Sequence, residues 1–511
     1  MVYDASDPDI CCPKPNCKVY QSARIYCRKG LRRQQFNPNS RFPGMNVNIF
    51  REYDIRGIVG EQLTDETVTA VARAIGIFLH RGGAQRIVVG YDARESSPGF
   101  AKILCDELIA CGLDVALLGM VPTPVVYHAT FTQKVDGGVM VTGSHNPPDH
   151  NGFKISLGTS TLFGPQIQEI KEIALQAETR PSGSVSLAGQ TSSLDVLDDY
   201  IKDILSKISL GPRKIKAVID AGNGAGGITA VPVYERLGVD VVKLYTDPDP
   251  TFPNHPPDPS QIQNLADAQA AVLQHNADIG IAFDGDGDRI TVVDDNGRII
   301  WGDELMILLS RTVLAERPGA TIIAEVKCSQ TLFDDIERQG GKAIMERAGH
   351  SIIKSRMKAT GAVLAGEMSG HIFFADRFYG FDDAAYVGAR LIEILSRTDK
   401  KLSELFEGVP ETFSTPELRV ACPEEVKFQV VADVSQHFAA KHKVITVDGV
   451  RIIFDGGWGL VRPSNTQAIL VMRFEADSPE RLNAIRYEVE SFVNASIARH
   501  GSEIPAVSSR D

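Results

Sequence analysis

The segment "GGVMVTGSHN" (residues 137–146) decides the fold, because its pattern returns twice further along the chain. "DIGIAFDGDGDR" (278–289) and "GAVLAGEMSGH" (361–371) are also short apolar runs that end in a polar, glycine-bearing loop. Apolar runs of this length predict buried strands. In α/β sheets, ligand-binding loops lie beyond the carboxyl ends of the strands. The three segments therefore predict three related domains, each with one such loop.

A second strand-and-loop pattern precedes each of these segments. It is present in "RIVVGYDARESS" (86–97), "KAVIDAGNGAGG" (216–227) and "TIIAEVKCSQTL" (321–332), and a helical stretch follows each time. Alternating strands and helices predict mixed, mostly parallel sheets with short crossovers. The repeat is too long for a solenoid.

The pattern changes after about residue 410. "KVITVDGVRIIFDGGWGLVRPSN" (443–465) and "QAILVMRFEA" (467–476) predict antiparallel strands with Asp-Gly turns. "SPERLNAIRYEVESFVNASI" (478–497) predicts a helix with a serine N-cap and proline at its first position. We expect three related α/β domains with mixed sheets plus a smaller C-terminal α+β domain around a central cleft. The predicted domain ranges are 45–195, 196–298, 299–409 and 410–511.

The first 44 residues differ in composition from the rest of the chain. They carry eight Lys/Arg against three Asp, while the whole chain has a formal net charge of −12. They contain no apolar run typical of a secretory signal. Their cysteines lack the paired C-x-x-C spacing of a zinc site. We expect residues 1–44 to be a disordered or appended segment, with globular patterning from Met45 onward.

The overall composition excludes several classes of partner. The net charge of −12 argues against binding to nucleic acid or to an anionic membrane. Apolar runs stay well below the 18 residues of a membrane-spanning helix. Beyond residue 44 the cysteines are scattered, as is typical of reduced thiols in a cytoplasmic protein. They are Cys105, Cys111, Cys328 and Cys422.

The loop "TGSHNPPDHNGFK" (142–154) places a serine at the tip of a predicted strand. Pro147 and Pro148 prevent a helix or a further ladder strand there, so Ser144 lies on a stiff loop. The loop is not the nucleophile elbow of serine hydrolases, which would need glycine at Asn146. Ser-His-Asn is also ordinary turn chemistry. This stretch alone therefore leaves the role of Ser144 open.

The loop "DGDGDR" predicts a metal site. Its three carboxylates at alternate positions would repel each other unless a cation compensates them. An all-carboxylate set suits Mg²⁺ or Ca²⁺ and not zinc. A solvated acidic turn stays open, whereas an EF-hand does not fit, because its sixth and twelfth positions hold Arg289 and Asp295. Arg289 also suggests that an anion shares the site. The candidate ligands are Asp284, Asp286 and Asp288.

Two further loops offer polar groups for a substrate. "RPSNT" (462–466) supplies a guanidinium, hydroxyls and an amide, which suits a phosphate monoester with Arg462 as the fork. "GEMSGH" (366–371) supplies a carboxylate and a hydroxyl, which suit vicinal sugar hydroxyls. For both, an ordinary polar turn is the alternative. Weaker single candidates in loop-like contexts are Arg56, Lys154, Lys327 and His350.

Taken together, these loops predict phosphoryl transfer on a phosphosugar. A serine, a divalent-metal loop, a hydroxyl-binding loop and a phosphate-binding loop occur in one chain. Mg²⁺ would neutralise the charge of the phosphoryl group during transfer.

The four loops, in this order and at these spacings, resemble the α-D-phosphohexomutase superfamily. The most similar type is the bacterial phosphomannomutase/phosphoglucomutase. The resemblance covers about residues 45 to 500. Three further motifs support it, namely "FREYDIRG" (50–57), "EVKCSQ" (325–330) and "AGHSIIK" (348–354).

This resemblance implies a reversible transfer of phosphate between C1 and C6 of hexose phosphates, mannose and glucose. Phospho-Ser144 would donate its phosphoryl group, and a hexose 1,6-bisphosphate would be both the intermediate and the activator. Mg²⁺ would be held by an oxygen on Ser144 and by Asp284, Asp286 and Asp288.

The resemblance also implies roles for single residues. His145 and Lys154 are candidates for proton transfer, and Arg56 is a candidate for stabilising charge. Arg289 is also expected to be a catalytic residue. The phosphate that does not react would be held by Arg462, Ser464, Asn465 and Thr466. The remaining residues expected to bind substrate are Tyr53, Lys327, His350, Glu367 and Ser369.

Three alternatives stay open. A phosphoglucosamine mutase of the same superfamily is expected to have alanine where this chain has Gly143. A mutase for a single sugar has the same loops. A non-catalytic Ca²⁺-binding protein would need no phosphoserine. The expected partners are phosphosugars, and the chain is expected to be a monomer or a weak oligomer.

Overall fold

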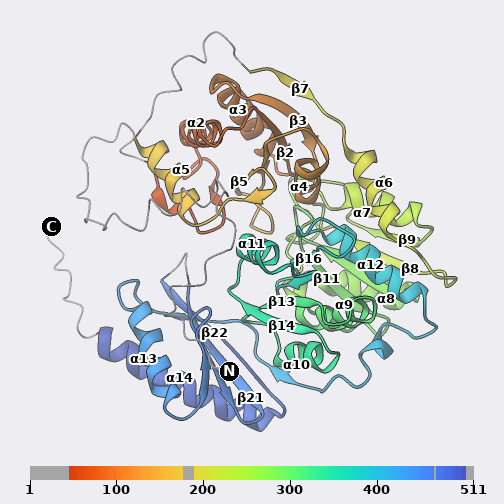
Figure 1. Ribbon diagram of the computed structural model, residues 1–511, viewed down its shortest axis with the longest axis vertical. Helices are drawn as coiled ribbons and strands as arrows, with labels where there is room; N and C mark the ends of the chain where they lie inside the picture. Colours follow the sequence, from red (N-terminus) through yellow and green to blue (C-terminus); the bar gives the residue numbers. More distant parts are fainter. Residues whose placement is uncertain (1–44, 177–188, 465–467, 502–511) are drawn as a thin grey trace. The chain divides into compact units, whose positions relative to one another are not determined.

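The computed structural model describes residues 45–176, 189–464 and 468–501 (Figure 1). The predicted appended segment, residues 1–44, lies outside the described residues. Four β-sheets confirm the predicted fold class of three α/β domains and a C-terminal domain. The expected boundaries at 195/196, 298/299 and 409/410 stay predictions, and β12 (Ile299–Ile300), just after the second of them, pairs with the second sheet.

The first sheet has the strand order β1-β5-β4-β2-β3-β7, and β6 pairs with β5. Strands β4, β2, β3 and β7 are parallel, whereas β5 is antiparallel to both β4 and β1. The strands are β1 Ile55–Ile58, β2 Arg86–Tyr91, β3 Asp114–Met120, β4 Gly137–Val141, β5 His150–Leu157, β6 Ser160–Thr161 and β7 Thr191–Ser193. The helices of this region are η1 Val47–Ile49, α2 Asp65–Arg81, α3 Ser97–Ala110, α4 Thr123–Thr132 and α5 Pro165–Leu175.

The second sheet repeats this plan in the order β12-β11-β10-β8-β9. Its strands β9, β8 and β10 are parallel, and β11 runs back antiparallel to β10. The strands are β8 Lys216–Asp220, β9 Asp240–Leu244, β10 Ile279–Phe283, β11 Ile290–Asp294 and β12. The helices are α6 Leu197–Lys207, α7 Gly227–Arg236, η3 Ile262–Leu265 and α8 Ala266–His275.

The third sheet has the order β14-β13-β15-β16, with β16 antiparallel to β15. Its strands are β13 Thr321–Glu325, β14 Lys342–Glu346, β15 Leu364–Gly366 and β16 Ile372–Phe374. The helices are α9 Gly302–Glu316, α10 Gln330–Arg338, α11 His350–Thr360, α12 Ala384–Ser396 and η4 Ser403–Phe406.

The three candidate loops occupy the same place in the three sheets. Each connects a buried parallel strand to an antiparallel neighbour, from β4 to β5, from β10 to β11 and from β15 to β16. This equivalence explains why the sequence repeats its strand-and-loop pattern three times.

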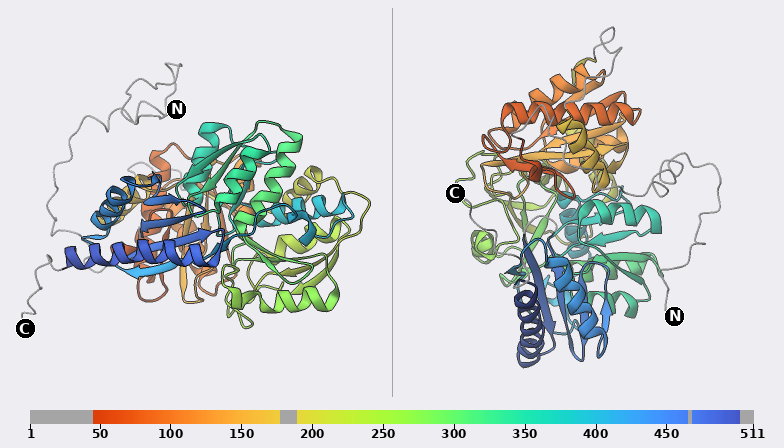
Figure 2. Two further views of the ribbon diagram at one scale, coloured as in Figure 1. Left: turned by 90° about the horizontal axis from the view of Figure 1, so that it is seen from below. Right: turned by 90° about the vertical axis from the view of Figure 1, so that its left-hand side faces the viewer.

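The fourth sheet is antiparallel throughout, in the order β17-β22-β21-β20-β19 with β18 beside β22. Gly449 and Gly456, in the two predicted Asp-Gly turns, have φ angles of 74° and 71°, which glycine adopts readily. Helices α13 and α14 lie side by side against this sheet (Figures 1 and 2). The elements are β17 Phe413–Ser414, β18 Leu418–Ala421, α13 Lys427–Ala439, β19 Lys443–Ile445, β20 Val450–Phe454, β21 Gly457–Pro463, β22 Ile469–Ala476 and α14 Pro479–Gly501.

One hydrophobic core runs through the first three domains. It joins Val126 of α4, Phe283 of β10 and Tyr386 of α12 in a single cluster. The first domain also has a core of its own, which includes Ile75 and Val139, and the fourth domain has a separate core, which includes Val434 and Phe474. Burying this much apolar surface is the main term that stabilises the fold.

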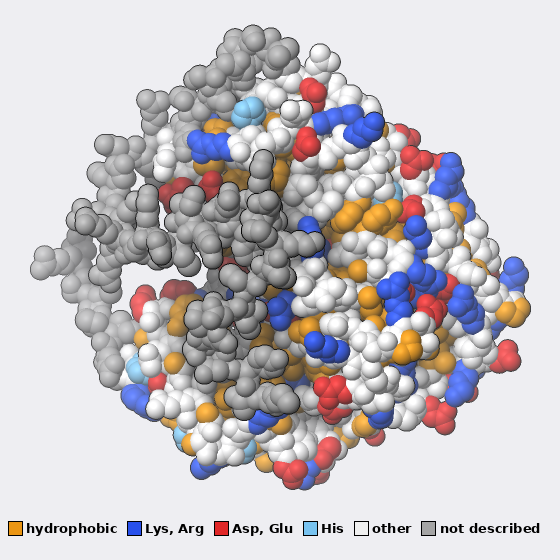
Figure 3. Space-filling model, viewed as in Figure 1, with side chains coloured by type: hydrophobic (Ala, Val, Ile, Leu, Met, Phe, Trp, Pro, Cys, Tyr) orange, Lys and Arg blue, Asp and Glu red, His pale blue; other side chains and the backbone are white. Residues whose placement is uncertain are grey.

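The surface carries charges of both signs. Acidic and basic side chains are interspersed along the right-hand side of the face drawn in Figure 3. No helix among the described residues is both long and apolar enough to cross a membrane. The four cysteines in the described ranges are buried and free of disulfide bonds.

Three of the single candidates differ from the loop contexts expected for them. Arg56 lies within β1, Lys154 within β5, and His350 is the first residue of α11. The short polar and glycine-containing stretches around them hide these elements in the sequence. Lys327 does lie in a turn, directly after β13.

Candidate active site

Ser144 lies in the turn that leaves β4 and is almost fully buried, with 1% of its surface exposed. Its φ angle of 50° is in the left-handed region, which is uncommon for a residue with a side chain. The Oγ of Ser144 donates to Oδ2 of Asp284 at 2.7 Å. Nδ1 of His145 lies 3.2 Å from the same Oγ. The serine loop and the metal loop therefore meet at this hydroxyl.

The serine loop is held from behind by two residues that the sequence did not single out. Asp92 accepts from Oγ1 of Thr142 at 2.8 Å and from the backbone N–H of Gly143 at 3.2 Å. Arg94 pairs with Asp92 and donates to backbone carbonyls of the loop, among them that of Ser144 at 2.7 Å. Both residues come directly after β2, in the quoted segment 86–97.

Asp284, Asp286 and Asp288 come together as predicted for the metal loop. All three are fully buried, and one oxygen from each lies within 4.8 Å of the others. Burial and the two neighbouring carboxylates raise the pKa of Asp284 well above its usual value. The cluster therefore needs more positive charge to keep all three carboxylates ionised.

Lys154 supplies part of that charge. Its Nζ donates to Oδ2 of Asp286 at 2.7 Å and also to Asp288. Burial opposes the charged form, yet the carboxylates of Asp286 and Asp288 raise the pKa of Lys154 well above its usual value. The raised pKa favours electrostatic stabilisation by Lys154 over acceptance of a proton. Thr123, at the start of α4, also donates to Asp286 through its hydroxyl, and the sequence did not single it out.

The residues present fit a hard divalent cation. Oδ1 of Asp286 is buried and accepts no hydrogen bond from the described residues, while Oδ1 of Asp288 faces only the ring of His371, at 3.3 Å. Such carboxylate oxygens are what Mg²⁺ prefers as protein ligands. The donor set contains oxygen alone, which does not suit a structural zinc ion.

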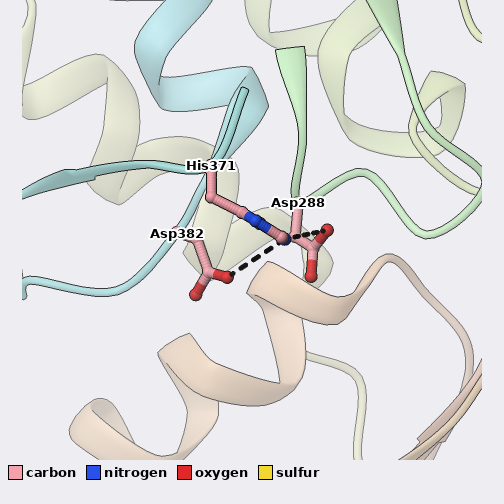
Figure 4. A group of neighbouring side chains, drawn as sticks. All are labelled: Asp288, His371 and Asp382. Atoms are coloured by element: carbon pink, nitrogen blue, oxygen red, sulfur yellow. Dashed lines mark ion pairs between the residues drawn. The ribbon is translucent and has the colours of Figure 1, made fainter. Parts of the chain in front are cut away.

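His371 links the metal loop to the third domain. Its Nε2 lies 3.3 Å from Oδ1 of Asp288 and 3.9 Å from Oδ2 of Asp382 (Figure 4). Its Nδ1 lies 2.7 Å from Oε2 of Glu367. Burial by itself would lower the pKa of His371. The neighbouring carboxylate of Asp288 outweighs this and raises the pKa to about 9.

One contact of His371 favours a neutral ring rather than a charged one, because the donor Nε of Arg289 lies 3.2 Å from its Nε2. A ring that donates from Nε2 to a carboxylate cannot also accept a bond there. Three carboxylates face the ring against one guanidinium, so we favour the charged imidazolium. The backbones of Arg289 and His371 also form an isolated antiparallel bridge.

Glu367 organises the loop expected to bind sugar hydroxyls. Its Oε1 accepts from the backbone N–H of Gly349 at 2.5 Å, while Oε2 faces His371. Burial opposes ionisation, but the bond to His371 lowers the pKa of Glu367 to about 2. A carboxylate with four acceptor positions still has capacity for substrate hydroxyls. Oγ of Ser369 lies 3.4 Å from Nδ1 of His371, in the same loop.

His350 and Tyr53 lie beside this loop. The ring of His350 stacks on His371 with centroids 5.4 Å apart, and its Nδ1 lies 3.5 Å from Asp382. Tyr53 donates to the backbone carbonyl of Ala348 at 2.7 Å. The sequence did not single out Asp382, which also accepts from Lys354 at 3.0 Å.

The phosphate-binding candidates lie where the fourth domain meets the third. Nη2 of Arg462 pairs with Asp448 at 2.9 Å. Nζ of Lys327 lies 3.5 Å from both Glu325 and Glu417. Arg462 and Lys327 are close enough to affect each other's charge. Both cations are thus paired with carboxylates, and their predicted role in binding phosphate stays a prediction.

The remaining predicted residues take distinct places. Arg56 donates from Nη1 to Oδ1 of Asn146 in the serine loop at 2.6 Å, and it pairs with Asp54. Nε of Arg289 lies 3.9 Å from Asp284. Burial, together with the guanidinium groups of Arg289 and Arg56, lowers the pKa of His145 well below its usual value.

The end of the phosphate loop is described only in part. Ser464 is buried, and its carbonyl accepts from Lys427 at 2.6 Å. Asn465 and Thr466 lie outside the described residues, so their predicted role in binding phosphate stays a prediction.

Comparison with known families accounts for most of the chain. Sequence models of the phosphoglucomutase/phosphomannomutase family match in four consecutive parts. The three alpha/beta/alpha domains match residues 47–181, 198–297 and 301–413. The C-terminal domain matches residues 417–491.

Curated relatives and a solved structure agree with this match. A Pseudomonas aeruginosa protein named phosphomannomutase/phosphoglucomutase is 45% identical over 445 residues, which cover 87% of this chain and 95% of that protein. A phosphoglucomutase from Neisseria meningitidis serogroup A is 45% identical over 451 residues, covering 88% and 97%. A crystal structure of a phosphoglucomutase/phosphomannomutase family protein from Burkholderia thailandensis has a TM-score of 0.83 and 40% identity, and covers 88% of this chain and 98% of that one.

Proposed function

Because the chain belongs to the phosphoglucomutase/phosphomannomutase family, we propose that it moves a phosphoryl group between C1 and C6 of hexose phosphates. The enzyme is an isomerase of carbohydrate metabolism. Mannose and glucose phosphates are the proposed substrates, and a hexose 1,6-bisphosphate is the proposed intermediate and activator. A cytoplasmic location and a monomeric or weakly oligomeric state stay predictions.

The observation that carries this proposal is the buried Ser144 hydroxyl, which is bonded to Asp284 at 2.7 Å. The hydroxyl is a suitable carrier of the phosphoryl group between two sugar positions. In the first transfer, the bond between phosphorus and the Ser144 oxygen breaks while a bond to the sugar oxygen forms. In the second, the other phosphate of the bisphosphate returns to Ser144.

The metal loop provides the negative half of the proposed site. Asp284, Asp286 and Asp288 would hold Mg²⁺ together with a phosphoserine oxygen. When bound, Mg²⁺ supplies charge neutralisation at the phosphoryl group. Lys154 and Arg289 flank these carboxylates and add fixed positive charge for the phosphoryl oxygens.

A base must take the proton that leaves the attacking sugar hydroxyl. Of the residues expected for this task, neutral His145 fits better than Lys154, which is held as a cation by two carboxylates. Arg56, bonded to Asn146 in the serine loop, and His371, beside Asp288 in the metal loop, would stabilise charge that develops on the sugar oxygen. This assignment of roles is part of the proposal.

The other end of the substrate would be held by the third and fourth domains. Arg462 and Lys327 would bind the phosphate that does not react, with Ser464, Asn465 and Thr466 completing the loop. Glu367 and Ser369 would hold O3 and O4 of the sugar, with His350 and Tyr53 beside them. Because O3 and O4 roughly exchange places when the intermediate turns over, such a site serves both orientations.

A coupled assay on three sugars tests the proposal. We expect kcat/KM for glucose 1-phosphate and mannose 1-phosphate to agree within about tenfold, roughly 1.4 kcal/mol, since a site that reads O3 and O4 is nearly blind to C2. Glucosamine 1-phosphate should be a poor substrate. The relatives named for both sugars and for glucose alone have the same identity to this chain, so only such an assay separates the bispecific enzyme from a single-sugar mutase.

One observation argues against the phosphoglucosamine mutase alternative. A methyl group at Gly143 would lie 2.5 Å from Cζ of Arg94 and 2.7 Å from the carbonyl oxygen of His150. Arg94 is fully buried and cannot easily move. The alanine expected in that enzyme class therefore does not fit this serine loop.

A further inference from the structure

The serine loop has an unfavourable backbone that must be stabilised from elsewhere. Ser144 has a left-handed φ of 50°, and Pro147 and Pro148 restrict the residues that follow it. The side chain of Ser144 makes its contact forward, to Asp284. The contacts that fix its backbone come from other residues, Arg94 and Thr142.

Those contacts converge on one guanidinium. Nη2 of Arg94 donates to the carbonyl oxygens of Ser144 at 2.7 Å and Asn146 at 2.6 Å. Nη1 donates to those of Pro147 at 2.5 Å and His150 at 3.0 Å. The Arg94 side chain is 0% exposed, so water does not compete for these bonds. The guanidinium of Arg94 therefore orients four backbone carbonyls along the loop.

Asp92 locks this guanidinium and the start of the loop together. Its Oδ2 lies 3.2 Å from Nε of Arg94 and also accepts from Thr142 and Gly143. Oγ1 of Thr142 in turn accepts from the backbone N–H of Ser144 at 2.7 Å. Both the N–H and the carbonyl of Ser144 are thus fixed through this pair.

The second domain contacts the same structure. Cζ of Arg94 lies 5.4 Å from the centroid of the Phe252 ring. In the metal loop, a methyl group at Gly285 would lie 2.4 Å from the carbonyl oxygen of Ser144. The carbonyl that Arg94 binds is therefore the one on which the metal loop rests, and its direction sets the spacing of the two loops.

We propose that Arg94 is a positioning residue for phosphoryl transfer, which holds the Ser144 hydroxyl against the metal loop without touching the substrate. The inference rests on the proposed function, since it assigns Arg94 to the step at Ser144. A lysine cannot replace it, because an ammonium lacks the planar fork that reaches four carbonyls. Displacing a reacting group by about 1 Å is enough to lower a rate by about 100-fold.

The test compares two buried arginines. Arg94→Lys should lower kcat by about 100-fold while the KM for glucose 1-phosphate stays unchanged, because the sugar and phosphate loops are untouched. Arg390→Lys is the matched control. Arg390 is 1% exposed and ion-paired with Asp376, and none of its described partners belongs to the candidate site. Both variants should lower the melting temperature, but only Arg94→Lys should lose kcat.

A second readout isolates the chemical step. In a single turnover with glucose 1,6-bisphosphate, intact-mass spectrometry should show that phosphorylation of Ser144 is slowed in Arg94→Lys to the same extent as kcat. Calorimetric binding of glucose 1-phosphate should be unchanged. A folded Arg94→Lys enzyme with wild-type kcat, or one with only a raised KM, would overturn the proposal.

If Arg94→Lys does not fold, Phe252→Leu decides, because it removes only the aromatic ring beside the guanidinium. A lower kcat at unchanged KM supports the positioning role, and wild-type kcat contradicts it. An inactive wild-type enzyme in the same assay would instead count against the proposed function, so the two failures can be told apart.

Discussion

The serine loop and the metal loop occupy equivalent places in their sheets, yet they are held in different ways. Behind the serine loop, Asp92 at the end of β2 binds the loop directly, and Arg94 binds its carbonyls. Behind the metal loop, Asp220 at the end of β8 faces His255 at 3.2 Å instead. The metal loop is held by backbone bonds, such as that from the N–H of Gly285 to the carbonyl of Pro257 at 3.1 Å.

The difference concerns where charge is balanced. The serine loop is held by a cation and an acid from its own domain, Arg94 and Asp92, which are paired with each other. The metal loop concentrates three carboxylates and depends on Lys154 from the first domain. It also has a buried carboxylate oxygen, Oδ1 of Asp286, that accepts no hydrogen bond from the described residues and is available to a further cation. The loop of the third domain is held in the same way as the serine loop. Glu325 at the end of β13 accepts from the backbone N–H of Met368 in that loop at 3.0 Å. Substitutions in the serine loop should therefore change the position of the Ser144 hydroxyl. Substitutions in the metal loop should change how activity depends on Mg²⁺.

The largest effect is expected at the hydroxyl where the two loops meet. Ser144→Ala should abolish turnover in the coupled assay and leave the melting temperature close to that of the wild type, because the phosphoryl carrier is lost while the contacts of Asp92 and Arg94 to the loop remain. Ser310→Ala is a matched control, since this hydroxyl in α9 is also fully buried. Near-wild-type turnover of Ser144→Ala at saturating glucose 1,6-bisphosphate would refute Ser144 as the carrier.

Metal dependence should distinguish the two loops next. EDTA-treated enzyme should be inactive and should recover with Mg²⁺. Asp286→Asn should raise the Mg²⁺ concentration needed for half-maximal activity by at least about tenfold. Asp294→Asn should not, since this buried carboxylate on β11 binds the N–H groups of Asn296 and Arg298. Activity that survives EDTA would mean that the metal assignment is wrong.

A smaller effect is expected away from both loops. Arg462→Ala should raise KM by about 10- to 100-fold and lower kcat less, because the loop grips the phosphate equally in the ground state and the transition state. Arg419→Ala, at an arginine of β18 whose side chain is 64% exposed, should change neither constant. A pure kcat defect in Arg462→Ala would show that the loop acts only in the transition state.

The smallest effect is expected in the ratio between substrates. Glu367→Ala should lower kcat/KM by about 1.5–3 kcal/mol, since it removes a charged acceptor. The loss should be similar for glucose 1-phosphate and mannose 1-phosphate, because Glu367 is fixed by His371 and Gly349 and would read O3 and O4. A variant that loses one epimer and spares the other would show that this loop reads C2.

Sequence reasoning worked where the chemistry is local. A few neighbouring residues are enough to predict the metal loop, from its alternating carboxylates. The same is true of the serine loop, from a serine between an apolar strand and two prolines. The same holds for the Asp-Gly turns of the fourth sheet and for the helix that begins at Pro479. In each case the neighbours that decide the structure are close in the sequence.

The rest depends on contacts between distant segments. Arg94 lies in one of the repeated strand-and-loop segments, residues 86–97, but an arginine in a sequence is typical of the surface. Its burial follows from carbonyls some 50 residues away. Asp382 and Thr123 are hidden for the same reason. Nothing near Asp92 or Asp220 indicates that one binds its loop and the other turns to His255.

The core shared by the first three domains has a consequence for how the protein melts. Val126, Phe283 and Tyr386 belong to one cluster, so the second and third domains are expected to unfold in one cooperative transition with the part of the first domain that shares this core. The fourth domain has its own core and meets the third through a small apolar cluster of Val326, Trp458 and Leu460. Differential scanning calorimetry should therefore resolve a separate transition for the C-terminal domain. Binding of glucose 1-phosphate, which would join the third and fourth domains, should draw the two transitions together.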